Sequence, residues 1–419
     1  MTMKSYTYIG PFTQLLTFED LPLRGSLHDS SLKIIKNGGV LLADHLIDCV
    51  GPHDQLVAKA KALNAEIITI EEPMIAMPGF IDAHTHICFS GSRASDYSLR
   101  NAGKTYLEIA KAGGGIWDTV TQTRNATELE LIDGIVHRAT QHAQQGSTTL
   151  EVKSGYGLTV EEELKMLSAI DKANKKLPVD LISTCLAAHM LPKDYHGTQE
   201  EYLNEIASEL LPVIKKKGLA NRVDAFIEQG AFTKDTIAPY FEKARELGFD
   251  ITVHADQFSV GGTEIAVKYG ALSADHLEAS SDKEIALLAK SNVTAIALPG
   301  ATLGLGCDFA PARKLLDSGA SLAIASDHNP GSAPMGDLLS EAAILGAFEK
   351  LTNAEVLAGI TIRAAAALGL KDRGILSQGY LADLIAFKTG DFREILYHQG
   401  SLKPNKVWKA GNLINSASN

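Results

Sequence analysis

Residues 78–86, Pro-Gly-Phe-Ile-Asp-Ala-His-Thr-His, end a short apolar run with two histidines that are separated by one residue. Phe80 and Ile81 are typical of a buried strand, which in a parallel sheet is apolar on both faces. Side chains two apart on a strand point to the same face, so His84 and His86 would present both imidazoles to one metal ion. The stretch therefore predicts a buried strand with half of a metal site at its carboxyl end.

Seven further apolar runs follow, and helix-length amphipathic stretches separate them. The helices are expected at 161–177, 201–217, 236–247, 262–269 and 282–291. This alternation favours a parallel sheet. Eight strand–helix pairs over about 250 residues are typical of a (β/α)8 TIM-like barrel in the α/β class, with an open doubly wound sheet as the alternative. The eight expected strands are 80–86, 148–153, 181–189, 223–228, 251–254, 272–276, 293–298 and 322–327.

Both ends of the chain have a different pattern. Residues 1–75 contain short strand-like runs such as 32–35 and 67–70, and we expect no helix there. After a helical run at 361–370, the chain returns to short strands and turns. We therefore predict one small composite β-sandwich domain, built from residues 1–75 and 376–419, that flanks a barrel domain of residues 76–375.

Composition limits the class of partner. The 419 residues are 45% hydrophobic and 21% charged, which is ordinary for a globular protein. With 39 Lys and Arg against 50 Asp and Glu, the net charge of -11 disfavours nucleic acids and anionic membranes. The four cysteines include no CxxC pair, and no long apolar run or leader-like segment is present. We expect a cytoplasmic protein with a small-molecule substrate, and a homodimer is compatible with the sequence.

Polar residues collect where the expected strands end. In a barrel these ends share one rim, where active sites are built. A single histidine at a strand end is more often structural, but six such residues together indicate a site; they are His84, His86, His189, His254, His276 and Asp327. The histidines expected in loops or on exposed helix faces are at 28, 45, 53, 137, 142, 196 and 398.

With His254, His276 and Asp327, the stretch 78–86 resembles the amidohydrolase superfamily of metal-dependent hydrolases. Residues 374–387, GILSQGYLADLIAF, are similar to the segment that returns to the β-sandwich in that superfamily, so the resemblance covers nearly the whole chain. Within the superfamily the sequence is most similar to the imidazolonepropionase family. The stretches that carry this likeness are 84–97, 111–120, 149–158, 270–278 and 326–334.

This resemblance implies hydrolytic ring opening of 4-imidazolone-5-propanoate to N-formimidoyl-L-glutamate, in histidine degradation. It implies one divalent ion, Zn²⁺ or Fe²⁺, since three imidazoles and a carboxylate suit both metals. The ligands would be His84, His86, His254 and Asp327. The substrate contacts would be Arg93, Tyr156, His189, Gln257, Asn329, Gly331 and Ser332, with Tyr106 a weaker match.

The residue types suggest a division of roles. A divalent ion with an open position lowers the pKa of bound water from 15.7 towards about 7. His276, expected to be unligated, would orient or deprotonate that water, and Asp327 would pass a proton to the leaving nitrogen. We also place Gln257 among the catalytic residues, with His276 and Asp327, although its amide cannot exchange a proton. Arg93 offers a planar fork of donors for the propanoate carboxylate.

Three alternative functions fit the sequence less well. A purine or pyrimidine aminohydrolase would carry Glu three residues after the third metal histidine, where this chain has Gln257. A two-metal hydrolase would need a bridging lysine at the end of strand four, where Glu228 and Gln229 stand; Lys153, on strand two, is expected to make an ion pair. A non-catalytic scaffold would have lost metal ligands, whereas every expected ligand position in this chain holds a residue that can bind a metal. The sequence departs from the family at residues 302–306, where an aromatic-rich stretch is usual. The sequence therefore does not predict which side chains line the cavity after strand seven.

Overall fold

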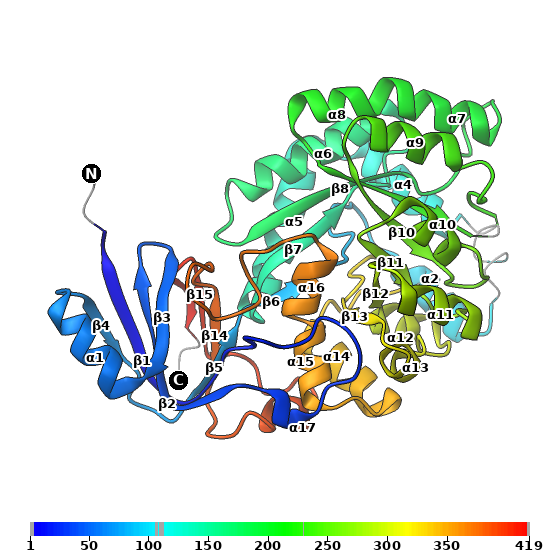
Figure 1. The fold of residues 1–419 in the computed structure, drawn as a ribbon. Helices are drawn as coiled ribbons and strands as arrows, with labels where there is room; N and C mark the ends of the chain where they lie inside the picture. Colours follow the sequence, from blue (N-terminus) through cyan, green and yellow to red (C-terminus); the bar gives the residue numbers. More distant parts are fainter. Residues whose placement is uncertain (1–3, 105–107, 109–112, 229, 417–419) are drawn as a thin grey trace.

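A barrel of eight parallel strands, in the order β6 to β13, forms the larger part of the molecule (Figure 1). The computed structural model describes residues 4–104, 108, 113–228 and 230–416. Helices cover the outside of the barrel, as Figure 1 shows. The barrel strands are β6 (Phe80–Asp82), β7 (Ser147–Lys153), β8 (Asp180–Ala188), β9 (Arg222–Ile227), β10 (Asp250–Ala255), β11 (Ser273–His276), β12 (Thr294–Ala297) and β13 (Ser321–Ile324).

The first and last strands of the barrel meet beyond their assigned ends. The amide of Asp327 donates to the carbonyl of His84 at 3.0 Å, and the amide of His86 donates to the carbonyl of His328 at 2.9 Å. Thr85 and His328 form the corresponding parallel bridge. The barrel prediction is therefore confirmed, and the open doubly wound sheet is wrong.

The predicted helices are present with shifted bounds. Four helices begin with a capping box, in which a Thr or Ser side chain and a Glu satisfy each other's backbone amides; they are α5 (Glu128–Gln144), α7 (Gln199–Glu205), α11 (Asp282–Lys290) and α15 (Asn353–Gly359). The stretch 201–217 is α7, a π segment (Ile206–Leu210) and α8 (Leu211–Lys217). The others are α2 (Ala94–Asn101), α4 (Ile116–Asn125), α6 (Val160–Asn174), α9 (Ala238–Glu246), α10 (Gly262–Tyr269), α12 (Pro299–Leu305), α13 (Ala312–Asp317), α14 (Leu338–Glu349), α16 (Ile362–Ala367) and α17 (Glu394–Tyr397).

A second sheet joins strands from the two chain ends, drawn in blue and red in Figure 1. β14 pairs antiparallel with β5, which brings residue 384 opposite residue 78. The predicted composite domain is thus present as a separate sheet, while its exact limits at 75 and 376 stay a prediction. The strands are β1 (Tyr6–Leu16), β2 (Ile34–Ala43), β3 (Leu46–Pro52), β4 (Glu66–Thr69), β5 (Ile75–Pro78), β14 (Leu384–Phe387), β15 (Lys406–Lys409) and β16 (Asn412–Ser416).

This sheet curls over a core of its own. β1 and β15 are three places apart in the strand order, which in a flat sheet means about 14 Å at about 4.8 Å per strand. The rings of Phe12 and Trp408 nevertheless lie 6.3 Å apart, edge to face, in the core of the sheet. The opposite face, with Met77 and Phe387, packs into the barrel core.

The N-terminal segment also contains a helix, which corrects the expectation of strands alone. α1 (His53–Ala62) buries Leu56 and Ala60, four residues apart on one face, against the sheet. His53 therefore lies in a helix, where its Nδ1 is 2.6 Å from the hydroxyl of Tyr8. Within the described ranges, no helix is both long and apolar enough to cross a bilayer.

Candidate active site

Four buried side chains bring ligating atoms together at the carboxyl rim of the barrel. The Nε2 atom of His86 lies 3.2 Å from that of His84 and 3.3 Å from that of His254. Asp327 Oδ1 lies 3.4 Å from the Nε2 atoms of both His84 and His86. The structure thus brings together the four residues that the sequence assigns to the metal.

The spacing of these atoms fits a divalent ion. For a tetrahedral ion with ligand bonds of about 2.0–2.1 Å, neighbouring ligand atoms lie about 3.3–3.4 Å apart, and the four distances given above, of the six among these atoms, are 3.2–3.4 Å. Two neutral imidazole nitrogens at this distance can share at most one proton, so a cation between them relieves their mutual repulsion. Three nitrogens and one carboxylate oxygen form a donor set that Zn²⁺ and Fe²⁺ accept.

Two carboxylates orient the imidazoles from behind. Asp275 Oδ2 lies 2.7 Å from Nδ1 of His84, and Asp224 Oδ2 lies 2.8 Å from Nδ1 of His254. Both carboxylates engage Nδ1, so Nε2 is the nitrogen that is left to face the cluster. Such carboxylate–histidine pairs are the usual second layer of a metal site.

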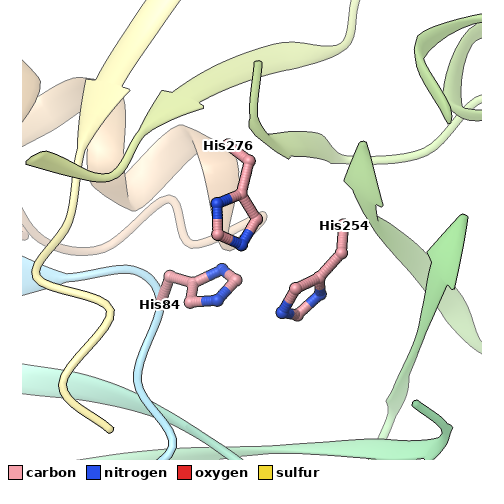
Figure 2. Close-up of side chains that lie close together, drawn as sticks. All are labelled: His84, His254 and His276. Carbon is pink, nitrogen blue, oxygen red and sulfur yellow. The ribbon is translucent and has the colours of Figure 1, made fainter. Parts of the chain in front are cut away.

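His276 stands on the same cluster. The ligand-capable atoms of His84, His254 and His276 lie within 4.8 Å of one another, as do those of His84, His86 and Asp327. Figure 2 shows the three rings converging from three different segments of the chain. The Nδ1 atom of His276 lies 3.5 Å from Glu278 Oε2. His276 therefore has access to the centre of the site, as a base must.

Burial and charge set the protonation of the cluster. Burial lowers the pKa values of His86 and His254 to about 3, so both imidazoles are neutral. Burial and Lys153 would lower the pKa of His84, but hydrogen bonding to Asp275 and Asp327 raises it to about 9. Burial would raise the pKa of Asp327, but hydrogen bonding to His84 and His86 holds it well below its usual range. A carboxylate and two neutral imidazoles are in the forms that bind a cation.

A cavity of about 630 Å³ opens directly on the cluster. Its wall includes His86, His254, His276 and Asp327 from the cluster itself. All the described residues that the sequence assigns to substrate binding line the same cavity; they are Arg93, Tyr156, His189, Gln257, Asn329, Gly331 and Ser332. Tyr106, the weaker match, lies outside the described residues.

The guanidinium of Arg93 is fixed at one side of this cavity. Its Nε donates to Asp96 Oδ2 at 2.8 Å, and the same oxygen accepts the amide of Gly115 at 2.9 Å. Arg93 Nη1 lies against Gly331, where a Cβ atom would come within 2.1 Å of it. Because the Nε atom is occupied, the terminal amino groups of Arg93 remain the donors available to a ligand in the cavity.

A buried carboxylate on α6 shapes the loop that carries Tyr156. Glu163 accepts the amides of Gly155, Gly157 and Leu158 at 2.8–3.2 Å. The carbonyl of Gly155 lies 2.8 Å from Nδ1 of His189, which leaves Nε2 of His189 free of that contact. Burial raises the pKa of Tyr156, and the charge of Asp327 adds to the rise, so the phenol is a neutral donor.

Asn329 folds the loop after β13 with its amide group. Its Oδ1 accepts the amides of Gly331 and Ser332, both at 2.8 Å. Its Nδ2 donates to the carbonyl of Asp327 at 2.7 Å and to Ser332 Oγ at 3.0 Å. The structure therefore places Asn329 as the organiser of this wall, whereas the sequence suggested only a contact with substrate.

The sequence did not predict several residues that line the cavity. Arg100, on α2, donates to the backbone carbonyl of Gly304 and, at 3.2 Å, to that of Gly331. It ties the helix after β6 to α12 and to the loop after β13. Leu305 and Cys307 supply the lining after strand seven that the sequence left open. No motif marks Arg100, because its partners are backbone carbonyls.

Two histidines, His142 and His328, lie buried behind the rim. For His142 this corrects the expectation from the sequence. His142, expected on an exposed helix face, is 1% exposed, and its Nε2 lies 2.9 Å from Nδ1 of His328. The other side of the ring faces Asp82 Oδ2 at 3.6 Å. The face of α5 that carries Leu131, Ile135 and Ala139 turns toward the barrel core and takes His142 with it.

Comparison with known proteins agrees with this arrangement. Residues 75–414 match the model of the amidohydrolase family. An imidazolonepropionase of Bacillus cytotoxicus is 40% identical over 405 residues, covering 96% of this chain and 94% of the relative. An imidazolonepropionase of Myxococcus xanthus is 41% identical over 367 residues, 87% of each chain.

Solved structures support the fold. A triazine hydrolase variant superposes with a TM-score of 0.74 at 15% identity, covering 98% of this chain and 95% of that one. A zinc-bound adenosine deaminase from Xanthomonas campestris gives 0.71 at 18% identity, covering 98% and 93%. At such identities the likeness concerns the fold alone. On the evidence of the sequence relatives and the family match, the chain belongs to the amidohydrolase family and, within it, to the imidazolonepropionases.

Proposed function

We propose that the chain hydrolyses the ring of 4-imidazolone-5-propanoate to N-formimidoyl-L-glutamate, a step in histidine degradation. One observation carries the proposal. The cluster of three imidazoles and Asp327 opens on a cavity whose wall also holds the Arg93 guanidinium. A small cyclic amide with a carboxylate tail has the size and the charge that such a cavity accepts.

The cofactor in this proposal is one divalent ion, Zn²⁺ or Fe²⁺, held by His84, His86, His254 and Asp327. When bound, such an ion supplies Lewis acidity for a ring carbonyl and lowers the pKa of water. The end of β9 favours a single ion, because Glu228 there accepts the amides of Phe258 and Ser259 at 2.9 and 3.1 Å. Lys153 pairs with Glu151 and Asp224, so it is not a free bridging ligand.

The reaction adds water across one ring bond. The water oxygen joins the carbonyl carbon, the bond from that carbon to the ring nitrogen breaks, and the nitrogen gains a proton. In our proposal His276 accepts a proton from the attacking water, and the ionised carboxylate of Asp327 relays that proton to the leaving nitrogen. His276 is buried beside the cluster with Glu278 behind its Nδ1. Gln257 lines the cavity and can hydrogen-bond the ring, but its amide does not carry protons.

Recognition of the substrate falls to the side of the cavity with Arg93. Its free amino groups match a carboxylate in a planar, charge-assisted pair. Tyr156 and Ser332 add hydroxyl donors, and His189 adds an imidazole beside them. The backbone of Gly331 lets the guanidinium approach closely, since any side chain there would displace it.

The test is a comparison of substrates with the purified, metal-loaded protein. Ring opening of 4-imidazolone-5-propanoate is measured against deamination of guanine and cytosine. We expect turnover of the imidazolone alone. Release of ammonia from guanine or cytosine at a comparable kcat/KM would instead favour an aminohydrolase.

Location and assembly stay proposals from the sequence. Four cysteines without a CxxC pair suit a reducing, cytoplasmic compartment. A net charge of -11 suits a small-molecule substrate better than a nucleic acid. Light scattering of the purified chain would test the homodimer.

A further inference from the structure

Lys153 places a fully buried ammonium group beneath the metal-ligand cluster. It ends β7 and is 0% exposed. Its Nζ lies 2.8 Å from Glu151 Oε1, 2.9 Å from Asp224 Oδ2 and 3.8 Å from Asp275 Oδ2. One cation therefore faces three buried carboxylates.

Each of these carboxylates supports a different part of the ligand cluster. Asp275 contacts Nδ1 of His84, and Asp224 contacts Nδ1 of His254. Asp224 also accepts the amide of His254, at 3.2 Å. All the contacts of Asp224 and Asp275 with imidazole nitrogen are at 2.7–2.8 Å.

The third carboxylate supports the backbone between the first two ligands. Glu151 Oε2 accepts the amide of Thr85 at 3.2 Å, and the Thr85 hydroxyl donates to the carbonyl of Glu151 at 2.6 Å. Thr85 separates His84 from His86, so its position sets the spacing of both imidazoles. Through Glu151, Lys153 is connected to this part of the site as well.

The strand pattern explains why these groups meet. Lys153, Asp224 and Asp275 come from β7, β9 and β11, which are alternate strands of the barrel. Alternate strands fill one layer of a barrel interior. The two carboxylates of this layer and the neighbouring Glu151 would repel one another in a medium that screens charge poorly, and the ammonium group among them offsets that repulsion.

We propose that Lys153 is a positioning residue of the metal centre. It holds Glu151, Asp224 and Asp275 in place, and through them it sets the direction and spacing of the imidazoles of His84, His86 and His254. Lys153 does not line the cavity, and the groups with which it forms ion pairs are carboxylates. The proposal rests on the proposed divalent ion, and it predicts an effect on metal affinity that an ordinary buried ion pair would not have.

Lys409 provides the matched control. It lies on β15 in the second sheet, is 6% exposed, and pairs with Asp180 and Asp383 at 2.7 and 2.6 Å. Lys153 and Lys409 are therefore both buried lysines with more than one carboxylate partner. Only the partners of Lys153 contact metal-ligating histidines.

The experiment compares Lys153→Met with Lys409→Met. Zn²⁺ affinity is measured without substrate, by competition with a chromophoric chelator, and thermal unfolding is recorded for the metal-free proteins. Removal of a group that supports metal ligands typically weakens metal binding by about 10- to 100-fold, and we expect a loss in this range for Lys153→Met. Lys409→Met should lower the thermal midpoint and leave Zn²⁺ affinity within about twofold of the parent.

Equal Zn²⁺ affinity in Lys153→Met and the parent would overturn the proposal, whatever the change in thermal midpoint. If Lys153→Met does not fold, Glu151→Gln decides the question, because it removes one of the three buried negative charges and keeps the side-chain shape. Zn²⁺ binding at least threefold weaker in Glu151→Gln supports the proposal, and unchanged binding overturns it. A parent protein that binds neither Zn²⁺ nor Fe²⁺ would overturn the proposed function as well.

Discussion

The barrel rim and the curled sheet of the chain ends bury very different groups. At the rim, His84, His254 and Asp327 are nearly inaccessible, and His86 Nδ1 has no hydrogen-bond partner within the described residues. In the sheet, the core cluster consists of apolar side chains, among them Trp408, whose Nε1 is the one polar atom of that ring and is also without a hydrogen-bond partner in the part of the chain that the structure describes. Burying several polar and charged side chains together costs stability, and such a cluster is typical of a place that performs chemistry.

This difference in buried groups predicts where substitutions act. Changes at the rim should alter metal binding or turnover and leave the fold in place. Changes in the sheet should alter the fold and leave the turnover of folded molecules unchanged.

The largest effect is expected at His276. His276→Ala should lower kcat by about 100- to 10,000-fold, the range for loss of a general acid–base group, while metal content stays near that of the parent. His254→Ala should lose the metal instead. Because His276 lies within reach of His84 and His254, metal analysis of both variants decides between base and ligand. Loss of metal from both would show that His276 is a ligand.

The sheet should respond in the opposite way. Trp408 is 1% exposed and packs edge-on against Phe12. Trp408→Ala should lower the free energy of unfolding by about 3–5 kcal/mol, measured by denaturant titration. The kcat per folded molecule should match the parent. A fall in kcat at full folding would mean that the sheet contributes to the site and would break the contrast.

Arg93 is expected to have an intermediate effect. Arg93→Ala should lower kcat/KM by about 10- to 150-fold, which corresponds to about 1.5–3 kcal/mol for a lost charge-assisted pair. The kcat/KM for an analogue without the carboxylate should be nearly the same in the parent and in Arg93→Ala. Measurement of both proteins on both compounds gives the answer. Equal losses on the two compounds would assign Arg93 to loop support through Asp96.

The smallest effect is expected at the loop that Glu163 organises. Glu163→Gln keeps one carbonyl acceptor and replaces the other with a donor facing the amide of Gly155. Tyr156 and His189 should lose part of their alignment, which we expect to raise KM by about 2- to 10-fold, the equivalent of one neutral hydrogen bond. Metal content should not change. A variant with the parent's KM would show that the loop keeps its shape without this carboxylate.

Much of the architecture could be predicted because parallel strands are apolar on both faces and end at one rim. The alternation of apolar runs and amphipathic stretches after residue 80 predicts the barrel, and it predicts His254 and Asp327 at the ends of strands. α1 could not be predicted in the same way, since its buried face consists of Leu56 and Ala60 alone. Such a short apolar pattern does not separate a helix from a strand.

The charged layer and the loop supports lay beyond sequence reasoning. Asp224 and Asp275 sit in the middle of strands, and nothing in their spacing shows that both face Lys153. His142 and Arg100 act through partners 186 and 204 residues away. Contacts of this kind depend on how the barrel closes, which a linear pattern does not contain.

In the proposed function, one divalent ion held by the rim cluster enables ring opening. The most direct measurement is titration of the metal-free protein with Zn²⁺ or Fe²⁺ while ring opening of 4-imidazolone-5-propanoate is followed. We expect no turnover without metal, and a rise in turnover that saturates at one ion per chain. Full turnover after complete chelation, or saturation only at two ions per chain, would contradict it.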